Sequence, residues 1–140
     1  MYNQMKLYKK EYLLSIAMIT VGGLIYLLYR PQNILLFQIT DSLGLNPYIT
    51  SLRNDISYIS LPLFVINSIP AGLWTASYLL LMYCNTKSYN KSTKLLITLP
   101  LPISAIILEF MQLLSWCPGT FDLFDLICYI IPLIIFLKSA

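Results

Sequence analysis

The sequence predicts an all-α integral membrane protein, a four-helix transmembrane bundle built as a single domain over residues 1–140. Composition is the first reason: 58% of the residues are hydrophobic and only 11% are charged, whereas a soluble domain has about 25% charged residues. Size is the second, because a soluble chain of 140 residues has too much surface to hide so many apolar side chains. The mean hydropathy of +0.72 agrees. We therefore expect a multi-pass protein of the cell membrane, with the lipid bilayer as solvent.

The first predicted helix covers residues 12–29, an uncharged run between the charged residues 9–11 and Arg30. At 1.5 Å per residue this run reaches about 27 Å, which is enough for one crossing. A cleaved signal peptide would also begin with lysines and an apolar core. Bulky residues follow Gly22 and Gly23 where a cleavage site would be needed, so we expect the helix to be retained.

The second predicted helix covers residues 69–84. Pro70 suits a first helical turn, and either Asn67 or Ser68 before it can cap the free amides. The outer segment 31–68 mixes apolar with polar residues and does not span. Two interpretations of it stay open. Its part 31–55 is either an amphipathic piece that lies on the membrane surface or a loop packed over the helices, and its part 57–67 is expected to be non-helical or re-entrant.

The third predicted helix covers residues 95–116, and Pro100 and Pro102 are expected to bend or delay its start. The fourth covers 122–137, and its apolar run 123–137 reaches about 22 Å, less than the roughly 30 Å of the hydrocarbon core. A short helix leaves its end below the membrane surface. The sequence therefore predicts a polar recess at the outer ends of the short helices.

Lysines predict the orientation. With four spans, every lysine falls on one side together with Glu11, and the other acidic residues fall on the opposite side with Arg30 and Arg53. The positive-inside rule then places both termini in the cytoplasm. The lysines are Lys6, Lys9, Lys10, Lys87, Lys91, Lys94 and Lys138.

The composition also excludes several chemistries. Without histidine, Ser-His-Asp and Cys-His nucleophile systems are impossible. Three scattered cysteines do not supply a tetrahedral zinc set, and no glycine-rich phosphate loop is present, so we expect no metal and no cofactor. The dispersed net charge of +3 does not indicate nucleic-acid binding.

Polar residues at membrane depth mark the candidate site. Glu109 and Gln112 are three residues apart and share one face of the third helix, and Asp122 and Asp125 do the same on the fourth. The connection between these helices is short, so both pairs are expected at similar depth on the outer side. An ionisable residue in a membrane helix is costly and is a functional candidate by default.

Each candidate also has a purely structural interpretation. The aspartates can cap the fourth helix. Glu109 can pair with Arg53 or be exposed at the interface, and Trp74 can belong to the interfacial aromatic belt. Under the functional interpretation, the ligand-binding residues are Glu109, Gln112, Asp122, Asp125, Arg53, Asn67 and Trp74.

The same polar residues carry a family resemblance. The stretches 108–112 (LEFMQ) and 119–125 (GTFDLFD) resemble the closing motif of the VanZ-like membrane proteins, with Glu-x-x-Gln on one helix and Asp-x-x-Asp opening the next. The resemblance covers residues 107–132, and 67–74 looks like a second block. Gly119-Thr120 stands where the family commonly has an arginine. The resemblance implies a cell-envelope protein whose ligand is lipid-like or glycopeptide-like.

Three functions follow from these observations. In the first, an outward-facing acidic recess binds a lipid headgroup or another amphiphilic ligand. In the second, the chain is a non-catalytic subunit, and its polar residues hold it to a partner membrane protein or to copies of itself. In the third, it is a membrane enzyme that uses Glu109 and an aspartate as an acid/base pair. The sequence does not separate the first from the second.

Overall fold

The computed structural model describes residues 8–31 and 35–139, and within these ranges every regular element is a helix. The predicted all-α class is therefore confirmed for this part of the chain. Lys6 and Ile34, which contribute to the predicted inner charge and outer segment, lie outside the described residues. The helices are α2 (Lys9–Tyr29), α3 (Leu35–Ser42), α4 (Asn46–Asp55), α5 (Leu63–Asn67), α6 (Ile69–Asn85), α7 (Lys91–Thr98), α8 (Pro100–Leu113) and α9 (Leu123–Ser139).

Two segments are long and apolar enough to cross a membrane: α2 and the stretch Leu63–Asn85, which joins α5 and α6. The pair α7 and α8 becomes a third if its two halves, bent by 45°, count as one span. The helix predicted over 95–116 is this bent pair, and its helical part ends at Leu113. The predicted fourth helix corresponds to α9, which has 17 residues.

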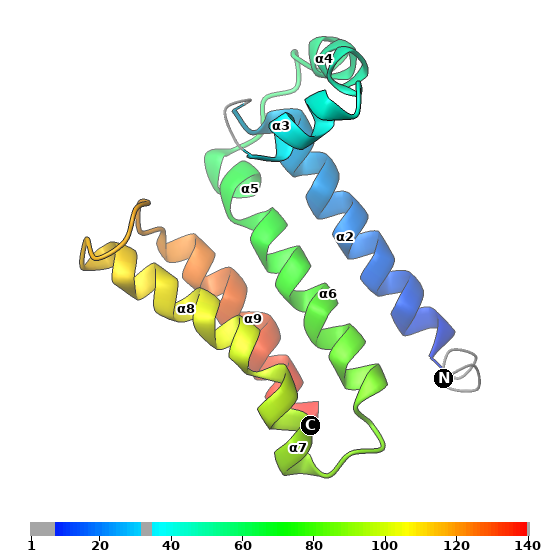
Figure 1. Cartoon of the computed structure of the whole chain (residues 1–140), viewed down its shortest axis with the longest axis vertical. Helices are drawn as coiled ribbons and strands as arrows, with labels where there is room; N and C mark the ends of the chain where they lie inside the picture. Colours follow the sequence, from blue (N-terminus) through cyan, green and yellow to red (C-terminus); the bar gives the residue numbers. More distant parts are fainter. Residues whose placement is uncertain (1–7, 32–34, 140) are drawn as a thin grey trace.

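Helix α6 holds the bundle together, with α2 along one side and α9 along another, while α8 packs against α9 (Figure 1). Glycines allow the two closest approaches. A Cβ atom at Gly22 of α2 would lie 2.8 Å from Nε1 of Trp74, and one at Gly72 of α6 would lie 2.9 Å from Cβ of Cys128. Small residues at helix contacts are typical of membrane bundles, where close packing drives association.

The bundle is polar inside and apolar outside. Ser15 and Ser77 are fully buried, and each hydroxyl donates to the other residue's carbonyl oxygen, at 3.2 Å and 3.0 Å. Large apolar side chains instead cover the surface, and Leu96, for example, is 76% exposed. Water would disfavour this arrangement, whereas lipid tails solvate apolar side chains as well as a protein core does. The burial pattern therefore agrees with the predicted membrane environment.

The bend between α7 and α8 has a local cause. Pro102 has no N–H to offer the carbonyl of Thr98, four residues earlier in the chain. That carbonyl accepts a hydrogen bond from the Tyr78 hydroxyl at 3.3 Å. The bend lies where the prolines were expected to disturb the helix, and it turns α8 relative to the rest of the span.

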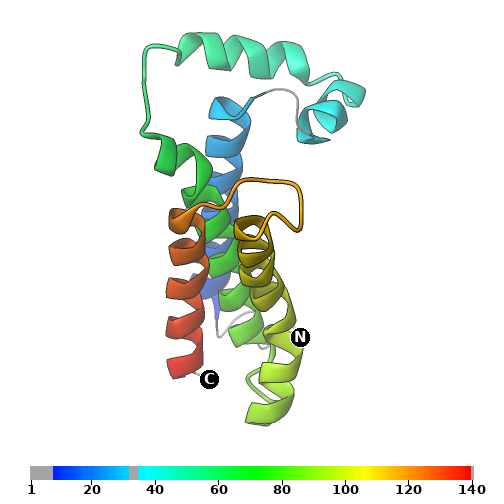
Figure 2. The ribbon, with the colours of Figure 1, turned by 90° about the vertical axis from the view of Figure 1, so that its left-hand side faces the viewer.

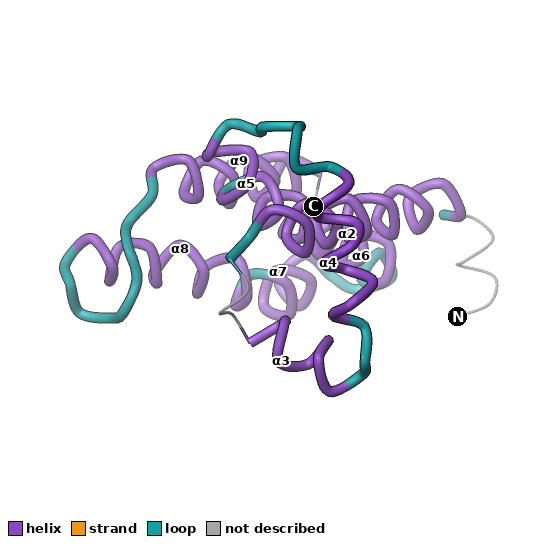
Figure 3. The backbone as a smooth tube through the Cα atoms, turned by 90° about the horizontal axis from the view of Figure 1, so that it is seen from above, coloured by secondary structure: helices purple, strands orange, loops and turns teal. Residues whose placement is uncertain are grey.

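The outer segment is mostly helical. Helices α3 and α4 lie across the end of the bundle (Figure 2), and from above α4 is seen over the ends of α2 and α6 (Figure 3). Arg53 ties α4 to α2, because its Nη1 donates to the carbonyl of Leu27 at 2.8 Å. Its guanidinium also lies 5.4 Å from the ring centroid of Phe37 on α3. Tyr48 and Leu52 remain exposed, so the segment both packs on the bundle and presents an apolar surface.

Charges separate along the bundle. Helix α2 begins, α9 ends and α6 joins α7 at one end (Figure 1), which we call the lysine end. There the Lys87 ammonium lies 4.9 Å from the ring centroid of Tyr8, and that of Lys94 lies 4.8 Å from the ring centroid of Tyr83. The described lysines, all at this end, are Lys9, Lys10, Lys87, Lys91, Lys94 and Lys138.

Candidate functional site

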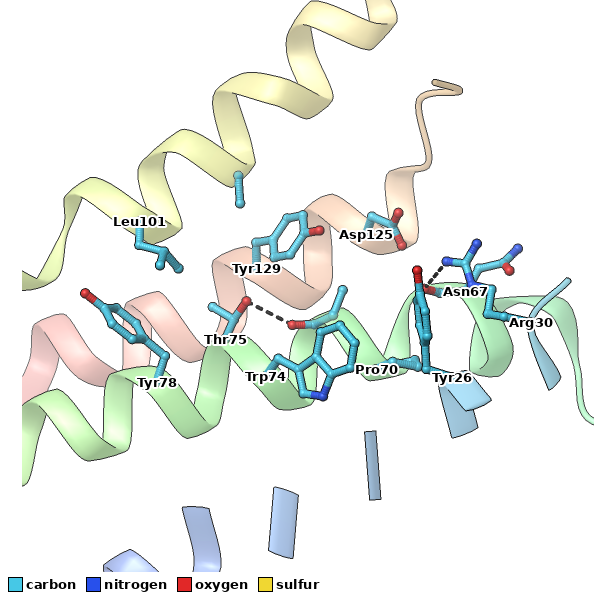
Figure 4. A pocket seen from close by; sticks show the side chains of 12 residues that line it. Tyr26, Arg30, Asn67, Pro70, Trp74, Thr75, Tyr78, Leu101, Asp125 and Tyr129 are labelled. Atoms are coloured by element: carbon cyan, nitrogen blue, oxygen red, sulfur yellow. Dashed lines mark hydrogen bonds between the residues drawn. The ribbon is translucent and has the colours of Figure 1, made fainter. Parts of the chain in front are cut away.

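A cavity of about 500 Å³ lies between α2, α6, α8 and α9 (Figure 4). We call it the central cavity. Its apolar walls come mainly from the start of α6 and from α8, and its polar side chains come from α2, α5, α6 and α9. The lining residues are Tyr26, Arg30, Asn67, Pro70, Ala71, Trp74, Thr75, Tyr78, Leu101, Ala105, Asp125 and Tyr129.

Arg30 is the positively charged side chain among the described residues that line the cavity. The proline that follows disfavours helical backbone at Arg30, which ends α2 in an extended conformation (φ −74°, ψ 152°). Nη2 of Arg30 donates to the carbonyl of Asn67, the last residue of α5, at 3.1 Å. The guanidinium lies 5.3 Å from the ring centroid of Tyr26, within the range of a cation–π contact. These contacts leave the buried Nε without a partner among the described residues.

Asp125 is the carboxylate that faces the same space, from the first turn of α9. Tyr129 follows one turn later and also lines the cavity. The buried Oδ1 of Asp125 has no hydrogen-bond partner in the described part of the chain. Arg30 and Asp125 thus face one cavity, and no hydrogen bond between them is present within residues 8–31 and 35–139. Buried polar groups without partners are uncommon and need an explanation.

Aromatic rings form one wall of the cavity. The rings of Tyr26 and Trp74 lie 5.3 Å apart between centroids, at an angle of 44°. Nε1 of Trp74 donates to the carbonyl of Ile19 on α2 at 3.4 Å, and Gly22 leaves room for the indole. The wall therefore depends on the close contact between α2 and α6.

Three of the seven predicted ligand-binding residues line the cavity: Asn67, Trp74 and Asp125. Arg53 does not, because its guanidinium is engaged with Leu27 and Phe37. It therefore forms no pair with Glu109 of the kind that the structural interpretation allowed.

Glu109, Gln112 and Asp122 build the connection between α8 and α9 rather than the cavity wall. Glu109 is buried, and its Oε2 accepts from the main-chain N–H of Asp122 at 3.3 Å. Oδ1 of Asp122 in turn accepts from the N–H of Phe124 at 2.8 Å, which caps α9 as the structural interpretation expected. The Gln112 side chain packs against Gly119, where a Cβ atom would lie 2.6 Å from Nε2.

Sequence reasoning missed the positive half of the cavity. An arginine just after an apolar run, as Arg30 is, is normally read as an interface anchor. Tyr26, Thr75 and Tyr78 lie inside apolar runs, where aromatic and hydroxyl side chains are common and carry no site signal. The recess predicted as acidic therefore contains one carboxylate and one guanidinium among its described lining residues.

Comparison of the chain with protein-family models, curated proteins and solved structures found no match. The VanZ-like resemblance thus remains a prediction from the motif. Among the described residues, no group of three or more His, Cys, Asp or Glu side chains is placed to hold a metal ion. What the cavity offers a ligand is a guanidinium, a carboxylate, hydroxyl and amide groups, and an aromatic wall.

Proposed function

We propose that this chain is a VanZ-like protein of the cell membrane whose outward-facing recess, the central cavity, binds a lipid headgroup or another amphiphilic ligand. One observation carries the proposal: two oppositely charged side chains, Arg30 and Asp125, face the same 500 Å³ cavity. Each retains an atom without a hydrogen-bond partner among the described residues. Burying such groups costs free energy unless a partner completes their hydrogen bonds, and a polar headgroup can do so.

The proposed topology has four spans, with both termini in the cytoplasm. The concentration of lysines at one end supports it through the positive-inside rule. The 17 residues of α9 reach about 26 Å, so in this topology we expect the first turn of α9, and with it Asp125, to lie just below the outer membrane surface. Cysteine labelling of intact cells tests this orientation. Cys117 should react from outside and a Ser88→Cys variant should not, and the reverse pattern would refute it.

Lipid retention tests the function itself. Protein purified in a mild detergent from native membranes should carry a bound lipid or amphiphile, detected by native mass spectrometry. Asp125→Asn should reduce the bound fraction without reducing the amount of folded protein in the membrane. Asp55→Asn is the matched control, since it removes an exposed carboxylate at the end of α4. Equal retention by Asp55→Asn, Asp125→Asn and Arg30→Gln, or no retained molecule in the unmodified protein, would contradict the proposal.

The competing functions gain less support. Asp125 is the only carboxylate among the described lining residues, so an acid/base pair that includes Glu109 would have only one member in the cavity. A subunit role predicts that a partner chain covers the cavity. Such a partner would copurify in place of the lipid, which makes the same experiment decisive between the two.

A further inference from the structure

We infer that the ligand of the central cavity is a zwitterionic phospholipid whose headgroup joins a phosphate to a primary ammonium. The inference rests on the proposed function and specifies its ligand. Arg30 and Asp125 come from α2 and α9 and face the same cavity with opposite charges. A headgroup with both charges neutralises both side chains at once, whereas an anionic headgroup leaves Asp125 buried beside like charge.

In this inference the phosphate of the headgroup binds Arg30. A guanidinium presents planar, paired N–H donors that match phosphate oxygens. Here one donor, Nη2, holds the Asn67 carbonyl and the Tyr26 ring supports the guanidinium group. Both contacts fix the position of the guanidinium while Nε remains unpaired among the described residues. The protein therefore orients the guanidinium and leaves one of its N–H donors free for a ligand.

The primary ammonium of the headgroup binds Asp125. The carboxylate Oδ1 of Asp125 makes no hydrogen bond in the described part of the chain. The neighbouring Ser68 hydroxyl, which is also buried without a partner among the described residues, can supply one donor, whereas a primary ammonium brings three N–H donors and a full charge. A quaternary ammonium brings none, so it would satisfy the charge of Asp125 but not its hydrogen bond. The aromatic wall of Tyr26 and Trp74 favours either cation through its π faces. The unpaired carboxylate oxygen is thus what selects the primary amine.

A lipid fits better than a soluble molecule of the same chemistry, because the cavity reaches the lipid-facing surface. Two of its lining residues are also part of that surface: Leu101 is 51% exposed and Trp74 is 38% exposed. Helix α8 packs against α9, and it contributes only Leu101 and Ala105 to the described lining. A headgroup can lie between α6 and α8 while its acyl chains stay in the bilayer.

The test measures binding of dioleoyl lipids that differ only in headgroup, by native mass spectrometry of the purified full-length protein. Phosphatidylethanolamine should bind at least about tenfold more tightly than phosphatidylcholine and phosphatidylglycerol, the factor expected for one charge-assisted hydrogen bond. Equal affinities, or a preference for phosphatidylglycerol, would overturn the inference and leave the proposed lipid binding intact. Failure to bind any of the three lipids would overturn the proposed function as well.

Two variants test the two charged side chains of the cavity one at a time. Asp125→Asn should weaken phosphatidylethanolamine binding by about tenfold or more and leave phosphatidylglycerol binding unchanged or stronger. Arg30→Gln should weaken all three lipids by a similar factor, because all share the phosphate. Asp55→Asn and Lys91→Gln, which remove exposed charges outside the cavity, should change none. Circular dichroism checks folding, and if Arg30→Gln does not fold, the lipid ranking and Asp125→Asn still decide.

Soluble glycerophosphoethanolamine, the headgroup without acyl chains, distinguishes a lipid from a metabolite. It should compete only at concentrations far above those of the lipid, because it gains nothing from the apolar surface between α6 and α8. Binding as tight as that of phosphatidylethanolamine would overturn the lipid as the occupant.

Discussion

Two adjacent glycines of α2 allow a sharp test of how this bundle packs. Both Gly22 and Gly23 lie in the helix interior, so replacing either with alanine changes helix propensity by the same amount. Their surroundings differ. A Cβ atom at Gly23 meets nothing within 4 Å, whereas one at Gly22 lies 2.8 Å from Nε1 of Trp74 and 3.3 Å from the main-chain oxygen of Pro70.

The expected magnitudes follow from that geometry. Gly23→Ala should stabilise the protein by up to about 1 kcal/mol, because alanine restricts the unfolded chain and favours the helix. In Gly22→Ala the indole must retreat from 2.8 Å to at least the 3.4 Å of ordinary contact, and the Pro70 carbonyl is main chain and yields less. Overpacking of this kind costs about 1–3 kcal/mol, so Gly22→Ala should be less stable than Gly23→Ala by about that amount.

The assay is unfolding in SDS, monitored by far-ultraviolet circular dichroism, together with tryptophan fluorescence. A Trp116→Phe background isolates Trp74, since the chain has two tryptophans. Gly22→Ala should shift the Trp74 emission, because the indole loses its place on the Ile19 carbonyl, and Gly23→Ala should not. Equal stability of the two alanine variants, with unchanged emission in both, would refute the close packing of α2 on α6.

Other contacts lead to further predictions. Gly72→Ala should destabilise the α6–α9 contact by about 1–3 kcal/mol. The loss should be smaller in a Cys128→Gly background than in a Cys128→Ala background, because the closest atom is Cβ at 2.9 Å while the sulfur lies at 3.3 Å; SDS unfolding of each double variant against its cysteine single variant measures this. A double-mutant cycle of Ser15→Ala and Ser77→Ala should give a coupling of about 0.6 kcal/mol, and zero coupling would contradict the paired hydrogen bonds. Glu109→Leu should lower the free energy of unfolding by about 1–3 kcal/mol, because it leaves a main-chain N–H at the start of α9 unpaired. Glu109→Gln keeps an acceptor and should lose less. If Glu109→Gln destabilises the protein as much as Glu109→Leu does, the hydrogen bond to Asp122 does not stabilise this end of α9.

The sequence by itself determined the class of the protein and the approximate positions of its long helices. Apolar runs identify such helices because a bilayer demands a minimum length of apolar chain and satisfied backbone hydrogen bonds. The runs 12–29 and 69–84 accordingly fall within α2 and α6. Prolines 100 and 102 marked the bend before α8, since a missing N–H acts locally. The class, the helix positions and the bend depend on residues close together in the chain, so they could be predicted from the sequence.

Only the tertiary structure decided which polar residues meet. Glu109 and Asp122 were correctly expected to be near each other because a short turn joins their helices, yet they cap α9 rather than line the cavity. Arg30 and Asp125 come from opposite parts of the chain, and no spacing rule connects them. They line the same cavity because α2 and α9 both pack on α6, and Gly22 and Gly72 allow these close contacts. Which helix faces pack together depends on contacts between residues far apart in the chain, and a hydropathy pattern contains no information about those contacts.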